Sequence, residues 1–491
     1  MEIKQIDILQ EISSGNKNFD IKGDIIVPDI KPDIVSITTS NANTYIYKEE
    51  LSNGKIRIDG NIDAYIIYLS NNGETRSIQA TLDFMETIID EKAIEGKNLL
   101  TKIRIDFLEA KILNERKISL EAKLSVEYQI TEKINLEVNT EFEEFTKLQK
   151  LTENVKLPVL IGEGKTKTSV KEDIKIDTEE EAGEILKVDL KVVNSETKIS
   201  YNKVLAKAEA NVEILFSTEN GKIKKAEASL PILSFIDIEN VEENNECRVN
   251  YSIRNMLVKI NSGEMHSINF QTEFEIYCVA MKKEEISLVK DVYSLEKELE
   301  VEKKSIEIAL EEQSNESIKI EEQVSIENME NIYSVQAKPK IINNSLTGEV
   351  KSYEGEVEIE IYFSEHNNSN ISVKQIKLPF VKKSMNNINT ENLKVESCKY
   401  SLKGEEVNLE IEIGIDNNNL VNKEISYISK LKEKEENCRS DYNMFLYFVK
   451  NGDTIWNIAK KFKVSMQDVI NMNNLENPDR INVGDKLYIM K

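Results

Sequence analysis

Three segments of the chain alternate apolar and polar residues in the way that is typical of a half-buried β-strand. Their apolar positions are, in chain order, Ile56, Ile58, Ile62, Ala64, Ile66 and Tyr68; Val204, Ala206, Ala210, Val212, Ile214 and Phe216; and Val357, Ile359, Ile361 and Phe363. The aromatic residues that end the three segments are 148 and 147 residues apart. Such regular spacing indicates an internal repeat, with one β-rich unit occurring three times.

A polar turn and a returning strand follow each of these segments. Asn-Gly, which occurs in the first two turns, favours a tight hairpin because both residues tolerate positive φ. The turns are Asn71-Asn72-Gly73, Glu219-Asn220-Gly221 and the longer Glu365-His366-Asn367-Asn368. The returning strands pass through Leu82-Asp83-Phe84, Leu230-Pro231-Ile232 and Leu378-Pro379-Phe380, spaced by 148 residues. We therefore expect one β-hairpin in each repeat.

A second alternating strand closes each repeat. Its apolar residues are Ile118, Leu120, Ala122, Leu124, Val126 and Tyr128; Ile268, Phe270, Phe274 and Ile276; and Val407, Leu409, Ile411, Ile413 and Ile415. A period of two over this length gives a sheet with one buried and one wet face. The sequence therefore predicts a mostly β chain with three antiparallel β-sheet or sandwich domains, at residues 1–150, 165–310 and 315–430.

The segments between these domains are polar. We interpret residues 150–171 and 296–320 as joins between domains, and the pattern leaves open whether 295–313 is helix or extended strand. Gly162-Glu163-Gly164-Lys165 lacks the spacing of a phosphate loop and is interpreted as a turn. Residues 430–437 are almost all charged, so 431–445 are expected to form a solvated linker.

The last part of the chain changes to a helical period. Ile455, Ile458, Ala459 and Phe462 fall on one helical face, and Asp453 or Thr454 can cap that helix. A second short helix is expected to begin at Ser465, with Asp468 completing a capping-box-like start and Val469, Ile470 and Met472 packing on the first helix. With a strand on either side, residues 446–491 should form a small βααβ domain.

This stretch, with its turn Gly452-Asp453-Thr454 and its pair Asn477-Pro478, resembles the LysM family, which usually binds N-acetylglucosamine polymers. The resemblance implies a shallow groove between the loop before the first helix and the loop after the second. Trp456, the only tryptophan, either stacks on a ligand from an exposed position or packs at the start of the helix. The other groove positions are Asn451, Gly452, Asp453, Thr454, Ile455, Asn477, Pro478, Asp479, Arg480 and Ile481.

Charge and composition exclude several partners. The net charge is −24, whereas residues 447–491 carry seven basic and five acidic side chains and are therefore about +2. The acidic remainder would repel a phosphate backbone or an anionic membrane, so nucleic acid is not expected as a partner. No basic start is followed by a long apolar run, and no stretch of about 20 apolar residues occurs. We expect a cytoplasmic protein without a signal peptide or transmembrane segment.

Catalytic and metal-binding residues are scarce. The chain has two histidines, His266 and His366, and neither belongs to a Ser-His-Asp or His-x-x-x-His arrangement. Most hydrolase and metal chemistries therefore lack the residues they need. A pair of carboxylates, as in glycosidases, stays open in principle, but 88 acidic residues identify no particular pair. The acidic run at 179–181 lacks the spacing of a calcium loop. We expect no enzyme, no cofactor and no metal, and we expect reduced thiols at the widely spaced Cys247, Cys278, Cys398 and Cys438.

The first repeat begins with Val27-Pro28-Asp29-Ile30-Lys31-Pro32-Asp33-Ile34, whose two prolines exclude a central strand. With the repeated strands and the LysM-like end, the chain resembles the SPOCS-domain spore coat assembly proteins of spore-forming clostridia, in a SipL-like layout. The resemblance implies a scaffold in the mother-cell cytoplasm that docks coat proteins at the forespore surface. It also implies a coat morphogenetic ATPase (SpoIVA-like) as the partner.

Two functions follow for the LysM-like domain. As a glycan-binding module it would hold peptidoglycan; as a docking module it would bind other coat proteins. The expected cytoplasmic location favours protein docking, because peptidoglycan lies outside the membrane. In that case the basic residues Lys460, Lys461 and Lys463 would face an acidic partner.

Overall fold

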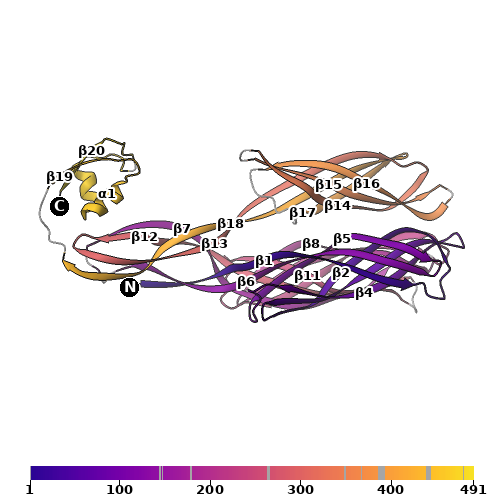
Figure 1. Ribbon diagram of the computed structural model, residues 1–491. Helices are drawn as coiled ribbons and strands as arrows, with labels where there is room; N and C mark the ends of the chain where they lie inside the picture. Colours follow the sequence, from indigo (N-terminus) through magenta and orange to yellow (C-terminus); the bar gives the residue numbers. More distant parts are fainter. Residues whose placement is uncertain are drawn as a thin grey trace.

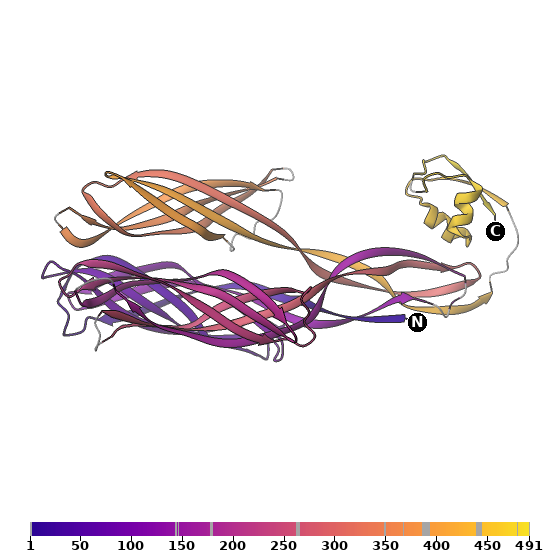
Figure 2. The same ribbon diagram turned by 180° about the vertical axis from the view of Figure 1, so that it is seen from behind.

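The structure is a computed structural model that describes residues 2–142, 145, 147–176, 180–261, 266–347, 350–366, 368–384, 393–437, 444–478 and 480–490. The molecule is elongated (Figure 1). Three β domains form a head at one end, long two-stranded ribbons leave the head as a stalk, and a small domain with two helices lies at the far end of the stalk. Figure 2 shows the same arrangement from behind.

Each repeat contributes six strands. The first contains β1 (Glu2–Ile26), β2 (Ile34–Ser52), β3 (Lys55–Ser70), β4 (Thr75–Ile89), β5 (Asn98–Asn114) and β6 (Lys117–Glu141). The second contains β7 (Leu148–Lys175), β8 (Ala182–Ser200), β9 (Lys203–Thr218), β10 (Ile223–Asp237), β11 (Glu246–Ile260) and β12 (Ser267–Ser294). The third contains β13 (Lys297–Ser325), β14 (Met329–Thr347), β15 (Val350–Glu365), β16 (Asn368–Ser384), β17 (Leu393–Lys403) and β18 (Glu406–Asn437).

The three repeats share one topology. In the first, one sheet has the order β1-β6-β5 and the other β2-β3-β4; the second and third repeat the same two orders with β7 to β12 and β13 to β18. All of these pairings are antiparallel. The predicted mostly β, repeated antiparallel fold is therefore confirmed. The predicted hairpins are β3–β4, β9–β10 and β15–β16.

One cross-strand pair in the core differs between the repeats at both of its positions. Gly60 lies opposite Phe84 and Gly355 opposite Phe380, and in both cases an added Cβ would overlap the phenylalanine ring and a backbone carbonyl. In the second repeat Ala208 lies opposite the smaller Ile232. The strand beside it, β8, carries a wider bulge there, with residues 194–195 outside the register. Ala208 is larger than the glycine of the other two repeats, and it fits because its partner Ile232 is smaller than phenylalanine and the bulge beside it is wider.

The head is held together at equivalent positions of the three repeats. Ile67, Leu215 and Tyr362, each next to the aromatic residue that ends its strand, are buried in one apolar cluster. The strand contacts between domains are also equivalent, because β4 contacts β8, β10 contacts β14 and β16 contacts β2. The three domains are therefore arranged around an approximate threefold axis, as three subunits would be in a cyclic trimer.

The stalk repeats this arrangement. The first and last strands of each repeat stay paired beyond the sandwich and form three ribbons, β1/β6, β7/β12 and β13/β18. Equivalent residues of the last strands are buried between the ribbons: Leu136, Ile286 and Ile425; Val138, Leu288 and Tyr427; and Phe142, Val292 and Leu431. The stalk therefore has a continuous apolar core built from one residue pattern used three times.

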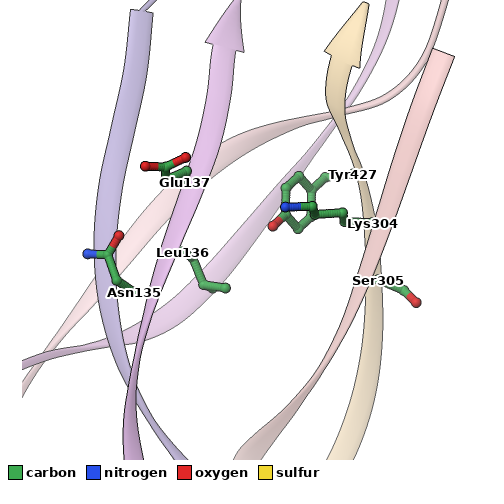
Figure 3. A pocket seen from close by; sticks show the side chains of 6 residues that line it. All are labelled: Asn135, Leu136, Glu137, Lys304, Ser305 and Tyr427. Carbon is green, nitrogen blue, oxygen red and sulfur yellow. The ribbon is translucent and has the colours of Figure 1, made fainter. Parts of the chain in front are cut away.

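One open cavity of about 390 Å³ lies between the first and third ribbons. Figure 3 shows Leu136 of β6 and Tyr427 of β18 beside it, with polar side chains around them. The other lining residues are Asn135, Glu137, Lys304 and Ser305.

The predicted polar joins are wrong, because those segments are strands of the ribbons. Residues 150–171 lie in β7 and 297–320 lie in β13, so 295–313 consists of a two-residue bend at 295–296 followed by strand. The predicted turn at Gly162 is also strand: a Cβ there would lie 2.8 Å from the Cγ2 of Ile238, and one at Gly164 would lie 2.6 Å from the Cγ2 of Ile236. Glycine in this strand lets β7 approach β10 closely.

The predicted solvated linker is wrong for its first half. Residues 431–437 continue β18 and pair with β13, with Leu431 opposite Val301 and Asn437 opposite Lys297. A charged strand of a two-stranded ribbon is stable here because Leu431 and Ile428 are buried among the other ribbons. Residues 438–443 lie outside the described residues, and 444–445 belong to the next strand.

The terminal domain has the predicted βααβ order: β19 (Met444–Phe448), α1 (Ile455–Phe462), α2 (Met466–Met472) and β20 (Lys486–Met490). β19 and β20 pair antiparallel, with Phe445 opposite Ile489. In the described part of the chain, no helix has the length and apolar character needed to cross a membrane.

Candidate functional site: the groove and stalk contact of the terminal domain

The loop before α1 is fixed by short hydrogen bonds. The Thr454 hydroxyl caps the helix by accepting from the backbone N–H of Asn457 at 3.1 Å. Asp453 accepts from the Lys450 backbone N–H and from the Tyr447 hydroxyl, both at 2.8 Å, and the Lys450 bond holds the pKa of Asp453 below its usual value. Gly452 supplies the positive φ of +85° that the turn requires. Of the two predicted caps, Thr454 is therefore the one used.

The region after α2 is fixed by a residue that the sequence analysis missed. The Asn473 side-chain amide donates to the carbonyls of Val469 and Tyr488 at 2.8 Å and accepts from the Tyr488 N–H at 2.7 Å. It thereby joins the end of α2 to β20. The predicted cap at Ser465 is absent, since its side chain makes no capping hydrogen bond. An asparagine at a helix C-terminus is a recognisable signal for such an arrangement.

The structure leaves five of the ten described groove positions open to solvent. Asp453, Pro478 and Ile481 are half-buried, and Asp479 lies outside the described residues. Ile455 is buried in the core of the domain, where Ile481 packs against the same apolar cluster and brings the bases of the two loops together. The exposed positions are Asn451, Gly452, Thr454, Asn477 and Arg480.

Trp456 does not line an exposed groove. Its side chain is 7% exposed, and its indole N–H donates to Asp291 Oδ2 of β12 at 2.8 Å. Its ring lies edge-on to Tyr293, with ring centroids 5.0 Å apart. Of the two interpretations left open by the sequence, packing is therefore the one that the structure shows, and the packing partner is the stalk.

Two of the predicted basic docking residues also face the stalk. Lys460 Nζ lies 2.6 Å from Asp291 Oδ2, and Lys463 pairs with Glu298. The third, Lys461, is exposed and lies over the Tyr447 ring at 5.0 Å. The prediction that Lys460 and Lys463 await an external acidic partner is therefore corrected, because the acidic partner is the protein's own stalk.

The tip of the stalk joins the core of the terminal domain. The Tyr293 hydroxyl donates to the Val464 carbonyl at 2.7 Å. Tyr293 and Leu295 pack in the same cluster as Trp456. The contact thus combines apolar burial with charge-assisted hydrogen bonds, which are stronger than neutral ones.

Burial alone would raise the pKa of Asp291. The hydrogen bonds from Lys460 and Trp456, together with the charges of Lys460 and Lys303, outweigh burial and hold this pKa below its usual value. A carboxylate whose folded pKa is depressed stabilises the contact above its unfolded pKa. That stabilisation is lost as the pH falls through the lower, folded value.

We therefore predict that the fluorescence of Trp456, the only tryptophan, stays constant from about pH 8 to pH 5 and changes only below about pH 4. A fluorescence titration of the full-length protein measures this. Asp291→Asn is the control and should show the altered emission throughout the range. A transition of the unsubstituted protein centred between about pH 5 and pH 7 would contradict the assignment of Asp291.

With this geometry in place, two family models match the chain. The LysM domain model matches residues 447–489, and the model of the SipL, SPOCS domain matches residues 181–261, which span β8 to β11. The chain therefore contains a SPOCS domain and a C-terminal LysM domain. Both are non-catalytic binding domains, and the SPOCS domain connects the protein with sporulation.

One curated relative supports the LysM assignment. The chain is 43% identical over 60 residues to the probable endopeptidase p60 of Listeria monocytogenes serovar 1/2a. The matched part lies in the LysM region and is 12% of this chain and 12% of p60. No solved structure matches the chain.

The histidines and cysteines do not gather into a site within the described residues, where no three His, Cys, Asp or Glu side chains form a group suited to a metal ion. His266 lies in an exposed turn before β12, and its carbonyl accepts from the Ile176 N–H at 3.0 Å. His366 lies in the exposed turn between β15 and β16. Cys247, Cys278 and Cys398 are free thiols, and Cys438 lies outside the described residues.

Proposed function

We propose that the protein is a non-enzymatic scaffold of spore coat assembly that docks coat morphogenetic proteins at the forespore surface. Its LysM domain is the protein-docking module, and its partner is the coat morphogenetic ATPase implied by the SPOCS resemblance. The observation that carries this proposal is the orientation of the LysM domain. Its α1 face is attached to the stalk while both groove loops, with Asn451 and Arg480, remain exposed.

The shape of the molecule supports a scaffold. β18 alone has 32 residues and at about 3.3 Å per residue extends roughly 100 Å. The apolar core of the stalk makes this length rigid, so the head and the LysM groove are held at a fixed separation. Two binding surfaces at a fixed separation can bridge two partners with high avidity.

The chemistry of the LysM domain favours a protein over a sugar. Its one tryptophan is committed to Asp291 and Tyr293 and therefore offers no stacking face to a glycan. The exposed groove residues Asn451, Thr454 and Arg480 are polar and can bind a peptide backbone or a carboxylate.

Peptidoglycan binding through the same groove is the second candidate function. It is favoured by the exposure of both groove loops and by the match of residues 447–489 to the LysM domain model. It requires the groove to reach N-acetylglucosamine polymers, whereas docking of the ATPase does not.

Groove substitutions distinguish the two candidates. Asn451→Arg/Arg480→Glu in the full-length protein alters both loops and makes the net charge more negative by one unit. It should weaken binding of the purified ATPase at least about tenfold, because one well-placed polar contact contributes 1.4 kcal/mol or more. Biolayer interferometry measures this affinity.

The matched control, Lys374→Glu/Gln375→Arg, makes the same two charge changes on the exposed face of β16 in the head. It should leave the affinity unchanged. If the groove variant binds the ATPase as tightly as the unsubstituted protein does, the groove is not the docking site. Loss of binding to chitin oligomers in the groove variant, with ATPase binding intact, would establish the glycan function instead.

A further inference from the structure

The stalk tip, here residues Asp291, Tyr293, Leu295 and Glu298, is built to hold the LysM domain. It presents two carboxylates to Lys460 and Lys463 and an aromatic ring to Trp456. The Asp291 side chain is 16% exposed and receives donors from both Trp456 and Lys460. The tip is itself anchored, since the Leu295 N–H donates to the Lys147 carbonyl at 3.2 Å.

The described residues at the other junction between ribbons pack differently. There, Phe142 takes the place of Val292 and packs inside the stalk, and Phe145 takes the place of Leu295. Phe145 packs with the stalk cluster, whereas Leu295 packs with the LysM cluster. Docking of the LysM domain is therefore a property of one tip and not of the repeat.

The contact between tip and LysM domain is held by non-covalent groups that are partly open to water. The Glu298 side chain is 45% exposed and that of Lys460 is 39% exposed. Partly exposed ion pairs contribute modestly, roughly 1 kcal/mol or less each. A covalently connected domain nevertheless stays docked, because the connection supplies an effective concentration on the order of 1 mM.

We propose that the stalk tip is an interchangeable docking surface whose second ligand is the LysM domain of another copy of this protein. A copy whose LysM domain is docked on another copy leaves its own tip without Lys460 and Lys463. The basic α1 face of a neighbouring copy is the complementary surface. At the high local concentration of an assembling shell, this exchange links scaffold molecules to each other. The linking contact is the same one that joins tip and LysM domain within a single molecule.

The same geometry limits the linked species. When two copies exchange their LysM domains reciprocally, each tip and each α1 face is satisfied, so the assembly closes at two molecules. An exchange in one direction leaves one tip and one α1 face free and continues into a chain. In dilute solution, intramolecular docking keeps the unsubstituted protein monomeric.

A charge-reversal experiment tests the proposal in the full-length protein. The tip-reversed variant is Asp291→Lys/Glu298→Lys, and the helix-reversed variant is Lys460→Glu/Lys463→Glu. Each alone places like charges across the contact, so each should be an open monomer with a red-shifted Trp456 emission. Mixed at about 20 μM, the two variants present complementary surfaces to each other and should form a 1:1 complex.

Analytical ultracentrifugation measures formation of the 1:1 complex, and Trp456 fluorescence measures whether the contact between tip and LysM domain is formed. The matched control carries all four substitutions in one chain, and it should regain most of the emission of the unsubstituted protein and remain monomeric. Mixing the unsubstituted protein with either variant should give at least tenfold less complex. Two open variants that do not associate would overturn the proposal, as would a tip-reversed variant whose Trp456 emission is unchanged.

This inference is separate from the function of the groove. Its readouts are self-association and Trp456 emission, which involve no coat protein, whereas the groove variant Asn451→Arg/Arg480→Glu leaves the α1 face intact. A failed exchange experiment would therefore leave the proposed ATPase docking untouched.

Discussion

Gly60→Ala is expected to destabilise the first repeat by about 3 kcal/mol. The added Cβ would overlap both the Phe84 ring and the Tyr45 carbonyl oxygen, and the carbonyl cannot move without disturbing the sheet. Overpacking of a dense core typically costs about 1–3 kcal/mol, and a backbone overlap places this substitution at the upper end. Hydrogen exchange of β2 to β4, followed by mass spectrometry, measures the loss of protection in this domain.

The repeats provide the matched controls for this substitution. Ala208→Gly, at the equivalent position of the second repeat, removes no clash and should cost only about 1 kcal/mol from strand flexibility. Gly60→Ala/Phe84→Ile copies the pair Ala208 and Ile232 and should recover part of the loss, although the wider bulge of β8 is missing. Equal protection in the Gly60→Ala protein and the unsubstituted protein would show that the close approach at Gly60 is not structural.

Tyr362→Ala is expected to separate the third domain of the head from the other two. The buried Tyr362 ring lies 4.5 Å from Lys187 Nζ, and its hydroxyl donates to Asn41 of the first repeat. Lys187, 1% exposed, also pairs with Asp189 at 2.6 Å. Truncating a buried aromatic residue costs about 3–5 kcal/mol, and here it also removes the cover of a buried charge.

Small-angle scattering measures this separation as an increase in the radius of gyration. Tyr362→Phe is the control: it keeps the ring over Lys187, loses only the hydroxyl with its hydrogen bonds to Asn41 and Glu360, and should leave the head closed at a cost of about 1 kcal/mol. Unchanged scattering of the Tyr362→Ala protein would show that the head does not depend on this contact.

The regular part of this fold follows from the sequence. The alternation through Ile56 to Tyr68 and its two copies predicts the central strands, since each has one face in a core. The helical spacing of Ile455, Ile458, Ala459 and Phe462 predicts α1 for the same reason. Local periodicity records which face is buried, and this is sufficient where one sheet or helix meets one core.

The ribbons could not be predicted in the same way. Among the described residues of β7, β13 and the end of β18, few side chains, such as Val155, Leu157 and Leu431, are buried, and charged and polar side chains fill many of the other positions. Such a strand looks like a polar linker until its partner strand is known. The spacing of Leu136, Ile286 and Ile425 at the same distance from the start of their strands was the available signal.

The contact of the LysM domain was hidden for a different reason. Trp456, Lys460 and Lys463 have the composition of an external binding face, and the sequence does not record that Asp291 and Glu298 lie opposite them. A contact between segments about 165 residues apart in the chain is set by the fold of the stalk. The groove loops, in contrast, follow from local motifs, because Gly452 and Thr454 determine the turn and the cap.

The most direct test of the proposed function is the location of the protein in a sporulating cell. The full-length protein fused to a fluorescent protein should form a ring at the forespore surface, and Lys374→Glu/Gln375→Arg should form the same ring. Asn451→Arg/Arg480→Glu should be diffuse in the mother cell although it is present in equal amount. A groove variant that still forms the complete ring would contradict the account, because recruitment would then not depend on docking through the LysM groove.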